Sequence, residues 1–516
     1  MILGSGLLAL LLLVILILQL HGICQHYAFY VVTGGETHCV YGIWKVQEGH
    51  SLYAWPNRDF YQLSLYNFGF YELYAAVLNL LHAHGPKIML YGRFLTMVLA
   101  VVGGLIQARL LCFLTTEWKS RAVDAAIYLL CFCTWFNSYF PGFYPVSVRP
   151  DIAAVALSTL GVYCFIRYAA ANNMLWLCAA GVTWAATWCL KQADVAAIFG
   201  AGVYLLFCRK WRAAFIMSAM FIIPVGSILL LGSPEYRWNI LVAPTANGLD
   251  FANGAKDFLK GAMLSLFIWS LIITVPLYLR REWQRDASFG WKTRWERLCP
   301  GNSLAPLAAL VIIVLCGWVP SFAALAKTGS SLNQMFEIFV VASTLSFVAA
   351  LRLASVLPPG GARRLSVAVG LLLLSMCVWP AGQLAMNRIG PITRATSADL
   401  VRKETFARFL TTLKKPLFIE DEIYSLPWHA SDNQYPAIKL DHIFYDDARA
   451  RGMLSGGVEN LVKNHWFSTL YIPTNSILYP EALAAQYHLL PLAADQTRCL
   501  DELNREAPPC VLLAAP

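Results

Sequence analysis

Ionisable side chains gather in a polar stretch that follows an apolar segment near the N-terminus. Residues 23–65 contain Glu36, His38, Arg58 and Asp59 among many aromatic residues. Carboxylates and imidazoles are the groups that most often move protons in catalysis, and an arginine supplies a fixed positive charge. The Tyr and Trp residues fit either an aromatic belt at a membrane interface or a sugar-binding surface. We predict that this first loop carries chemistry.

A second group of charged side chains stands at the ends of apolar segments, at Arg149, Asp151, Lys191 and Asp194. A charge at membrane depth costs about 2.5–3.5 kcal/mol on insertion scales, so such charges tend to pair or to serve a function. The two pairs could also be ion pairs at helix ends. A carboxylate near a helix start, as at Asp151, is favoured by the helix dipole whatever its function.

Three further polar residues lie near the ends of apolar segments. They are Lys327, Asn333 and Glu337. Asn333 and Glu337 are four positions apart and therefore share one face of a helix. They either bind a ligand or hydrogen-bond within the helix bundle, and the sequence leaves both interpretations open.

The composition is that of a protein embedded in lipid. Of the 516 residues, 58% are hydrophobic and 13% are charged, and the mean hydropathy is +0.55; a soluble domain carries about a quarter charged residues. Apolar segments lie near residues 3–20, 66–82, 92–114, 122–140, 152–169, 174–190, 192–208, 213–231, 258–279, 304–325, 335–351 and 365–385. We therefore predict an α-helical polytopic membrane protein with about 11–12 membrane helices.

Positive charge is concentrated in short loops, near residues 119–121, 209–212, 280–297 and 352–364. This is the orientation signal of an inner-membrane protein and argues against a nucleic-acid-binding surface, despite the net charge of +9. With the last three loops in the cytoplasm, the first loop and the C-terminal region both lie outside only if one apolar segment does not cross. We predict that 66–82, which contains Asn67, Glu72 and Asn79, lies along or re-enters the outer surface.

The composition changes at about Asn387. Beyond this point β-prone runs alternate with helical ones, among them PLFIED, VENLVKNHW, STLYIPT and EALAAQY. We predict two domains: a transmembrane domain at 1–386, whose first loop 23–65 is extracytoplasmic, and a small extracytoplasmic α/β domain at 387–516.

The sequence gives little support to a metal or redox centre. No C-x-x-C pair occurs among the 14 cysteines. His38 beside Glu36, or His82 with His84, could bind a divalent metal. No spacing matches a zinc site, so surface histidines are the favoured interpretation.

Five short motifs occur in order along most of the chain. After Glu36 come G-x-x-L-Y (Gly49–Tyr53), R-D-F (Arg58–Phe60), VRPDIAAVAL (Val148–Leu157), LKQA (Leu190–Ala193) and KTGSSLN (Lys327–Asn333). Together they resemble motifs of the GT-C class of membrane glycosyltransferases. The branch in question comprises protein O-mannosyltransferases, aminoarabinose transferases and rhizobial core-polysaccharide transferases. The order and spacing of the motifs carry the resemblance, since each is short.

This resemblance implies a reaction and its partners. A sugar would pass from a polyprenyl-phosphate donor to an acceptor glycan, lipid or protein on the extracytoplasmic face, with inversion. A first-loop carboxylate would act as general base. The family usually has Asp where this chain has Glu36, and the proline pair that often follows R-D-F is absent here. Glu36 is therefore the first candidate for the base and Asp59 the second.

The expected reaction also offers roles to the remaining polar residues. Lys327, Arg149 and Arg58 would stabilise the negative charge that develops on the leaving phosphate. The complete predicted substrate-binding set is Arg58, Arg149, Asp151, Lys191, Lys327, Asn333 and Glu337.

Two other functions were weighed against a glycosyltransferase. A transporter or flippase of a lipid-linked substrate commonly shows paired repeats and broken helices, and the sequence contains no internal repeat. A non-catalytic scaffold has little use for a polar first loop of this kind. The sequence thus favours a multi-pass enzyme of the bacterial inner (plasma) membrane, with the lipid bilayer and a lipid-linked sugar as its partners.

Overall fold

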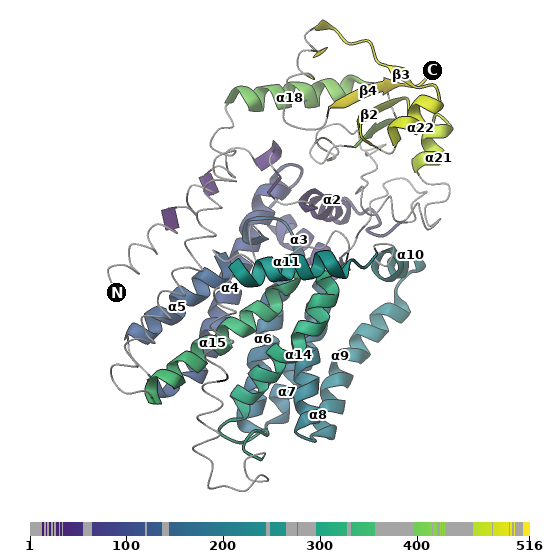
Figure 1. Ribbon diagram of the computed structural model, residues 1–516. Coiled ribbons are helices and arrows are strands. Elements are labelled where there is room, and N and C mark those ends of the chain that lie inside the picture. Colours follow the sequence, from purple (N-terminus) through teal and green to yellow (C-terminus); the bar gives the residue numbers. More distant parts are fainter. Residues whose placement is uncertain are drawn as a thin grey trace. The chain divides into compact units, whose positions relative to one another are not determined.

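The structure is a computed structural model (Figure 1). It describes residues 13–14, 17, 20–21, 24, 27–29, 31–32, 35–54, 64, 66–118, 121–136, 144–243, 248–264, 276, 296–327, 332–356, 397–414, 416–420, 424, 426, 428, 458–476, 478–494, 496–497, 500 and 509–516. The chain forms two compact units, each built from separate stretches. Unit 1 comprises Met1–Leu18, Leu95–Leu231 and Leu249–Asn387; unit 2 comprises Gln19–Phe94, Gly232–Gly248 and Arg388–Pro516.

The two units divide the chain differently from the sequence-based domains. The first loop belongs with the C-terminal region in unit 2, whereas the sequence analysis assigned it to the domain at 1–386. Helix α4 (Lys87–Leu114) begins in unit 2 and continues into unit 1.

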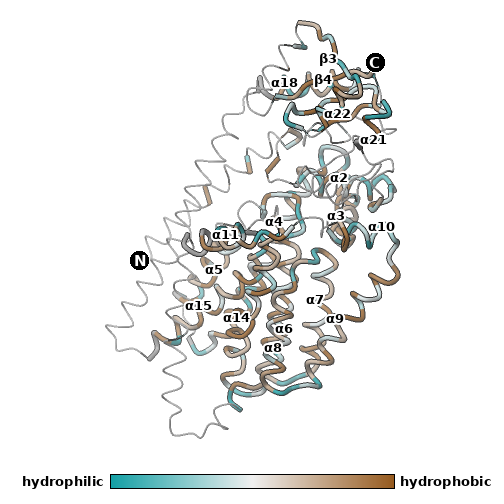
Figure 2. Tube along the Cα trace, turned by 45° about the vertical axis from the view of Figure 1, so that its right-hand side comes forward, coloured by the Kyte–Doolittle hydropathy of each residue, from teal (hydrophilic) through white to brown (hydrophobic). Residues whose placement is uncertain are grey.

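Unit 1 is helical. Besides most of α4, it contains α5 (Arg121–Phe136), α6 (Pro150–Ala171), α7 (Met174–Leu190), α8 (Ala196–Phe207), α9 (Trp211–Leu231), α11 (Phe251–Leu264), α14 (Ala305–Leu325) and α15 (Phe336–Val356), with short 3-10 turns η2 (Thr116–Trp118), η3 (Tyr144–Val146) and η6 (Leu332–Met335). Hydrophobic residues run along these helices and hydrophilic ones gather at the turns between them (Figure 2).

Among the described residues, five helices are long and apolar enough to cross a membrane. They are Lys87–Leu114, Pro150–Ala171, Trp211–Leu231, Ala305–Leu325 and Asn333–Leu353. Three shorter apolar helices lie at Val123–Phe136, Met174–Leu190 and Ala196–Phe207. The prediction of a polytopic α-helical membrane protein is therefore confirmed. Most of the predicted segments 3–20 and 258–279, and all of 365–385, lie outside the described residues.

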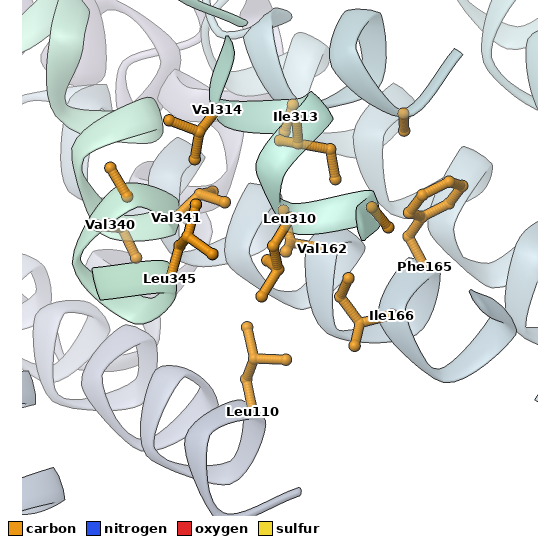
Figure 3. Close-up of a cluster of buried hydrophobic side chains, with 14 of the residues drawn as sticks. Leu110, Val162, Phe165, Ile166, Leu310, Ile313, Val314, Val340, Val341 and Leu345 are labelled. Atoms are coloured by element: carbon orange, nitrogen blue, oxygen red, sulfur yellow. The ribbon is translucent and has the colours of Figure 1, made fainter. Parts of the chain in front are cut away.

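The core of unit 1 is a continuous apolar cluster between helices. Leu110 of α4, Val162 and Phe165 of α6, Leu310 of α14 and Leu345 of α15 all contribute buried side chains (Figure 3). Small residues bring the helices close together, as membrane packing requires. A Cβ atom on Gly200 of α8 would lie 2.5 Å from the Cα of Ile313 in α14, so a larger residue would push these two helices apart.

Unit 2 combines helices with a small sheet. Its elements are η1 (Tyr27–Phe29), α2 (Glu36–Gln47), α3 (Phe68–Leu80), α10 (Pro234–Arg237), the π-helical turn η4 (Trp238–Val242), α18 (Ser397–Thr412), β1 (Leu417–Ile419), α21 (Val458–Lys463), β2 (Thr469–Pro473), α22 (Leu478–Ala484), β3 (His488–Leu489) and β4 (Cys510–Ala514). The strand order is β1-β2-β4-β3, with β1 parallel to β2 and the other two pairs antiparallel.

Side chains alternate between the two faces of this sheet, as the period of a strand dictates. Phe418, Leu470, Ile472 and Leu513 pack in one apolar cluster, to which Ala243 from the second stretch of the unit also belongs. Their immediate neighbours along the strands enter a second cluster on the other face, which includes Phe29 of η1. The sheet is therefore covered on both sides, and the predicted C-terminal α/β fold is confirmed.

The segment 66–82 forms the short helix α3 of 13 residues. At about 1.5 Å per residue it is roughly 20 Å long, which is less than the ~30 Å hydrocarbon thickness of a bilayer. Its placement along the outer surface remains a prediction.

Candidate active site

The hairpin of α6 and α7 brings the start of one helix next to the end of the other. Asn172 ends α6 in a left-handed conformation (φ 51°), and the side chain of Asn173 accepts a hydrogen bond from the backbone N–H of Leu175 at the start of α7. Because the connection is so short, the two helices run antiparallel. Asp151, in the first turn of α6, therefore lies beside Lys191, directly after α7.

Asp151 is the centre of a buried ionic cluster in unit 1. Its Oδ1 atom lies 2.9 Å from the Nζ atom of Lys191 and accepts a hydrogen bond of 2.5 Å from the Nδ2 atom of Asn333. Its Oδ2 atom lies 3.2 Å from the Nε atom of Arg149. The guanidinium of Arg149 also lies over the ring of Tyr144, 4.8 Å from its centroid. The structure thus brings together Arg149, Asp151, Lys191 and Asn333, four of the residues that the sequence selected.

Asp194 adds a second carboxyl group to Lys191. The Nζ atom of Lys191 lies 3.1 Å from the Oδ1 atom of Asp194. The Oδ2 atom of Asp194 is buried, and no described residue donates a hydrogen bond to it. Burial, with smaller contributions from the nearby Glu337 and Asp151, raises the pKa of this carboxyl group from 3.8 to about 7, against the opposing attraction of Lys191. Asp194 therefore carries a proton more readily than an exposed aspartate.

Glu337 stabilises the beginning of α8. Its Oε2 atom accepts a hydrogen bond of 2.8 Å from the N–H of Ala196, and its Oε1 atom accepts one of 3.3 Å from the N–H of Ala197. The hydroxyl of Ser158 in α6 also donates to Oε1. These N–H groups have no partner within the helix. The geometry favours the second of the two interpretations, in which Asn333 and Glu337 hydrogen-bond within the bundle.

Lys327 lies after α14, where the chain meets the start of α11. The backbone of Lys327 bridges to Leu249, and the N–H of Asp250 donates to the carbonyl of Ala326 at 2.7 Å. Burial lowers the pKa of the Lys327 amine from 10.5 to about 8. Within the part of the chain that the structure describes, its ammonium forms no ion pair.

Glu36 occupies a different, closed arrangement in unit 2. Gly35 precedes α2 with φ 76°, a left-handed conformation that favours glycine. The Nε and Nη2 atoms of Arg93 each donate a hydrogen bond of 2.9 Å, one to each carboxylate oxygen of Glu36. The N–H of Val32 donates a third, of 2.8 Å, to Oε2. Glu36 is 0% exposed and Arg93 is buried as well.

The other first-loop candidates, Arg58 and Asp59, lie outside the described residues. Among the residues that are described, no group of three or more His, Cys, Asp and Glu side chains is arranged to hold a metal ion. A metal site at His38 or at His82 and His84 therefore gains no support from the geometry of this region.

Sequence reasoning overlooked Arg93 and Ser158. Arg93 lies in the apolar segment 92–114, which also contains Arg109, and a charge within such a segment tends to have a partner. That rule identifies Arg93 as a paired residue, but it does not identify Glu36, 57 positions away, as the partner. A serine in an apolar helix, such as Ser158, gives no comparable signal.

Comparison with solved structures identifies the fold. ArnT from Cupriavidus metallidurans bound to undecaprenyl phosphate aligns over 99% of this chain and 98% of its own, with a TM-score of 0.54 and 12% sequence identity. The chain has an ArnT-like fold. The apo state of the same ArnT aligns over equal shares with a TM-score of 0.55 and 11% identity. ArnT is an aminoarabinose transferase of the GT-C class, so the expected GT-C-like fold is confirmed. No protein-family model and no curated protein matches the sequence.

Proposed function

We propose that this protein is a glycosyltransferase that moves a sugar from a polyprenyl-phosphate donor to an acceptor on the extracytoplasmic face of the inner membrane. The observation that supports this most is the ArnT-like fold. It extends over 99% of the chain, and one of the ArnT structures holds undecaprenyl phosphate, the kind of lipid carrier that such a donor contains. The long apolar helices of unit 1 suit a substrate whose tail lies in the bilayer.

The cations of unit 1 fit the leaving group of this reaction. As the bond between the anomeric carbon and the phosphate oxygen breaks, negative charge develops on the phosphate, and fixed cations stabilise it. Arg149 keeps 12% of its side chain exposed while Asp151 holds its Nε atom. Lys327 is charged below about pH 8 and forms no ion pair among the described residues. We assign the donor phosphate to Arg149 and Lys327, with Lys191 and Asp151 holding Arg149 in place.

The contacts of Glu36 argue against its role as the general base. Both oxygens of Glu36 already accept hydrogen bonds from Arg93 and Val32, and the side chain is fully buried. An acceptor hydroxyl would have to displace these donors to reach it. We therefore assign Glu36 to holding the start of α2, and we assign Asp59, the second candidate from the sequence, as the general base.

The proposed reaction is a single displacement. Asp59 takes the proton of the acceptor hydroxyl as its oxygen attacks the anomeric carbon. A new glycosidic bond forms, the bond to phosphate breaks, and the polyprenyl phosphate leaves with the bonding electron pair. Attack opposite the leaving group inverts the anomeric configuration.

The test uses purified wild-type protein and the Glu36→Gln, Asp59→Asn and Lys327→Met variants. Each is incubated with a panel of synthetic polyprenyl phosphates that carry radiolabelled sugars, and transfer or donor hydrolysis is measured. We expect turnover by the wild type and by Glu36→Gln if it folds, loss in Asp59→Asn, and weaker donor binding in Lys327→Met.

Two results would contradict this assignment. Loss of turnover in a well-folded Glu36→Gln variant, with Asp59→Asn active, would return the base to Glu36. Donor binding without turnover by every protein across the panel would favour a transporter of lipid-linked substrates instead.

A further inference from the structure

One arginine near the end of α6 is held by aromatic rings. The central carbon of the Arg167 guanidinium lies 4.5 Å from the ring centroid of Trp176 in α7 and 5.0 Å from that of Phe113 in α4. The ring of Tyr163, one turn earlier in α6, is 5.8 Å away, and its hydroxyl accepts a hydrogen bond of 2.8 Å from the Nη1 atom. We call these four residues of unit 1 the arginine cage.

The arginine cage holds a charge that has no acidic partner in the described part of the chain. No carboxylate there forms an ion pair with the guanidinium of Arg167. Arg149, at the start of the same helix, meets the carboxylate of Asp151 instead. The face of an aromatic ring attracts a cation but does not neutralise it. The full positive charge of Arg167 is therefore available to an anion.

The guanidinium also keeps hydrogen-bond donors for a ligand. Arg167 is partly buried, and its Nε and Nη2 atoms are neither hydrogen-bonded to a described residue nor enclosed by the protein. The N–H groups on these two atoms lie along one edge of the planar group. That edge matches two oxygens of a phosphate, which is why arginine is favoured where phosphate is recognised.

The position of the cage along α6 corresponds to the headgroup region of a bilayer. The 22 residues of α6 are long and apolar enough to cross a membrane, and about 20 residues span the hydrocarbon core. Arg167 lies four residues before the last residue of the helix, Ala171, which is about 6 Å along the axis. An aromatic residue such as Trp176 is typical of the membrane interface.

Further positive charge lies at the same end of the bundle. The ends of α6 and α8 both hydrogen-bond to the stretch 298–301, through the carbonyl of Ala169 and the hydroxyl of Tyr204. Arg209 and Arg212 follow α8 and are exposed. The sequence predicts that this basic turn is cytoplasmic, and basic residues on that side of a membrane attract anionic lipids.

We propose that the arginine cage binds the phosphate of an anionic phospholipid in the cytoplasmic leaflet. The phosphate accepts hydrogen bonds from the Nε and Nη2 atoms of Arg167, and the acyl chains lie along the apolar helices beside it. A headgroup amine would add a second positive charge next to Arg167, so a headgroup with a net negative charge is the better match. The site lies at the opposite end of α6 from Asp151, and it does not depend on the proposed function.

Photocrosslinking tests whether such a lipid occupies the cage. The purified full-length protein is reconstituted into phosphatidylcholine vesicles that contain a minor fraction of phosphatidylglycerol with a diazirine in its headgroup. After irradiation, the labelled peptides are identified by mass spectrometry. We expect the wild type to be labelled at the turn between α6 and α7. Arg167→Gln should lower that labelling about tenfold, because hydrogen bonds from a charged group are lost.

Two further variants control for folding and for the loss of positive charge. Arg167→Lys keeps the charge and the long side chain but loses the planar edge, so we expect an intermediate loss of labelling. It decides the test if Arg167→Gln fails to fold. The matched control is Arg109→Gln, which we expect to leave the labelling unchanged. Arg109 lies one turn before Phe113 in α4 and is exposed, and no described aromatic ring lies over its guanidinium.

The class and the source of the ligand are tested in the same vesicles. Phosphatidylcholine that carries the diazirine should label the turn much less than phosphatidylglycerol does. Excess inorganic phosphate at constant ionic strength should not displace the lipid, because phosphate alone gains nothing from the apolar helices. Full labelling of both Arg167 variants, an equal loss in Arg109→Gln, equal labelling by phosphatidylcholine, or displacement by inorganic phosphate would each overturn the proposal.

Discussion

Two buried ionic groups among the described residues differ in how their charges are matched. In unit 2, Glu36 and Arg93 bring together one charge of each sign, and two hydrogen bonds from Arg93 reach the two carboxylate oxygens. In unit 1, Lys191 is shared between Asp151 and Asp194, and one oxygen of Asp194 has no donor among the described residues. Arg149, at the edge of that cluster, keeps part of its side chain exposed.

This difference separates a structural role from a chemical one. One buried charge of each sign balances the other, so we expect the pair of Glu36 and Arg93 to hold two segments together. The cluster in unit 1 can respond to a new charge. An anion that binds near Arg149 changes the electrostatic interactions among Asp151, Lys191 and Asp194. The following four experiments challenge or sharpen this contrast.

Breaking the matched pair should give the largest effect on stability. Glu36→Gln leaves Arg93 buried without its counter-charge, and removing one partner of a buried ion pair costs about 3–5 kcal/mol. Denaturant unfolding in detergent measures this loss. Adding Arg93→Met to Glu36→Leu should recover most of it, because apolar residues replace a buried pair well. A Glu36→Gln protein as stable as the wild type would refute the structural role.

Removing charges from the cluster in unit 1 should instead lower the activity strongly. A double variant, Asp151→Asn with Lys191→Met, removes one charge of each sign, and we expect transfer to fall about 10²–10³-fold, as on loss of an electrostatic stabiliser. The matched control is Glu36→Leu with Arg93→Met, which should transfer within about tenfold of the wild type. Equal losses in the two double variants would show that the contrast between the clusters has no functional meaning.

The uneven cluster should also make stability depend on pH. The pKa of Asp194 is raised to about 7 in the folded protein, so the folded state binds more protons than the unfolded state between about pH 4 and pH 7. Stability is then greatest below the unfolded pKa of 3.8 and is lost as the pH rises through about 7. Between pH 5 and pH 7 the loss should be about 2 kcal/mol.

Asp194→Asn tests the assignment of this pH dependence. The amide cannot ionise, so the unfolding free energy of this variant should lose the decline that the wild type shows between pH 5 and pH 7. Parallel curves for the two proteins would mean that another group titrates.

A surface pair provides the smallest expected effect. Arg408 and Glu404 lie one turn apart on α18 with their charged atoms 3.9 Å apart, and both are largely exposed. Removing a pair of this kind costs about 0.3–0.5 kcal/mol, so Glu404→Gln should shift the unfolding midpoint only slightly, and less in high salt. A loss comparable with that of Glu36→Gln would show that burial is not what distinguishes these pairs.

Much of the fold could be predicted because local sequence patterns determine its helices and strands. Apolar segments marked the helices of unit 1, and the alternating runs after Asn387 marked strands such as Leu417–Ile419 and Thr469–Pro473. The convergence of Asp151 with Lys191 also follows from sequence, since a two-residue turn forces α6 and α7 to run antiparallel.

The remaining features depend on contacts between distant positions, which no local pattern reveals. The partner of Glu36 is one of many charged residues in the sequence, and only the folded chain selects Arg93. The sequence could not separate the two interpretations of Glu337 because a carboxylate on a helix face looks the same whether it meets a ligand or the N–H groups of α8. The N–H of Ser64 donates a hydrogen bond to the Oδ1 atom of Asn239, 175 positions away, and no local pattern predicts this contact either.

The central position of β4 in the sheet has a consequence for biosynthesis. This strand, Cys510–Ala514, pairs with both β2 and β3, and its apolar cluster also contains Phe29. The ribosome therefore releases Phe29 and the strand that completes its cluster roughly 480 residues apart, an interval on the order of half a minute to a minute and a half at bacterial synthesis rates. Until β4 emerges, this apolar cluster is incomplete. That interval makes the nascent chain a natural client for a chaperone.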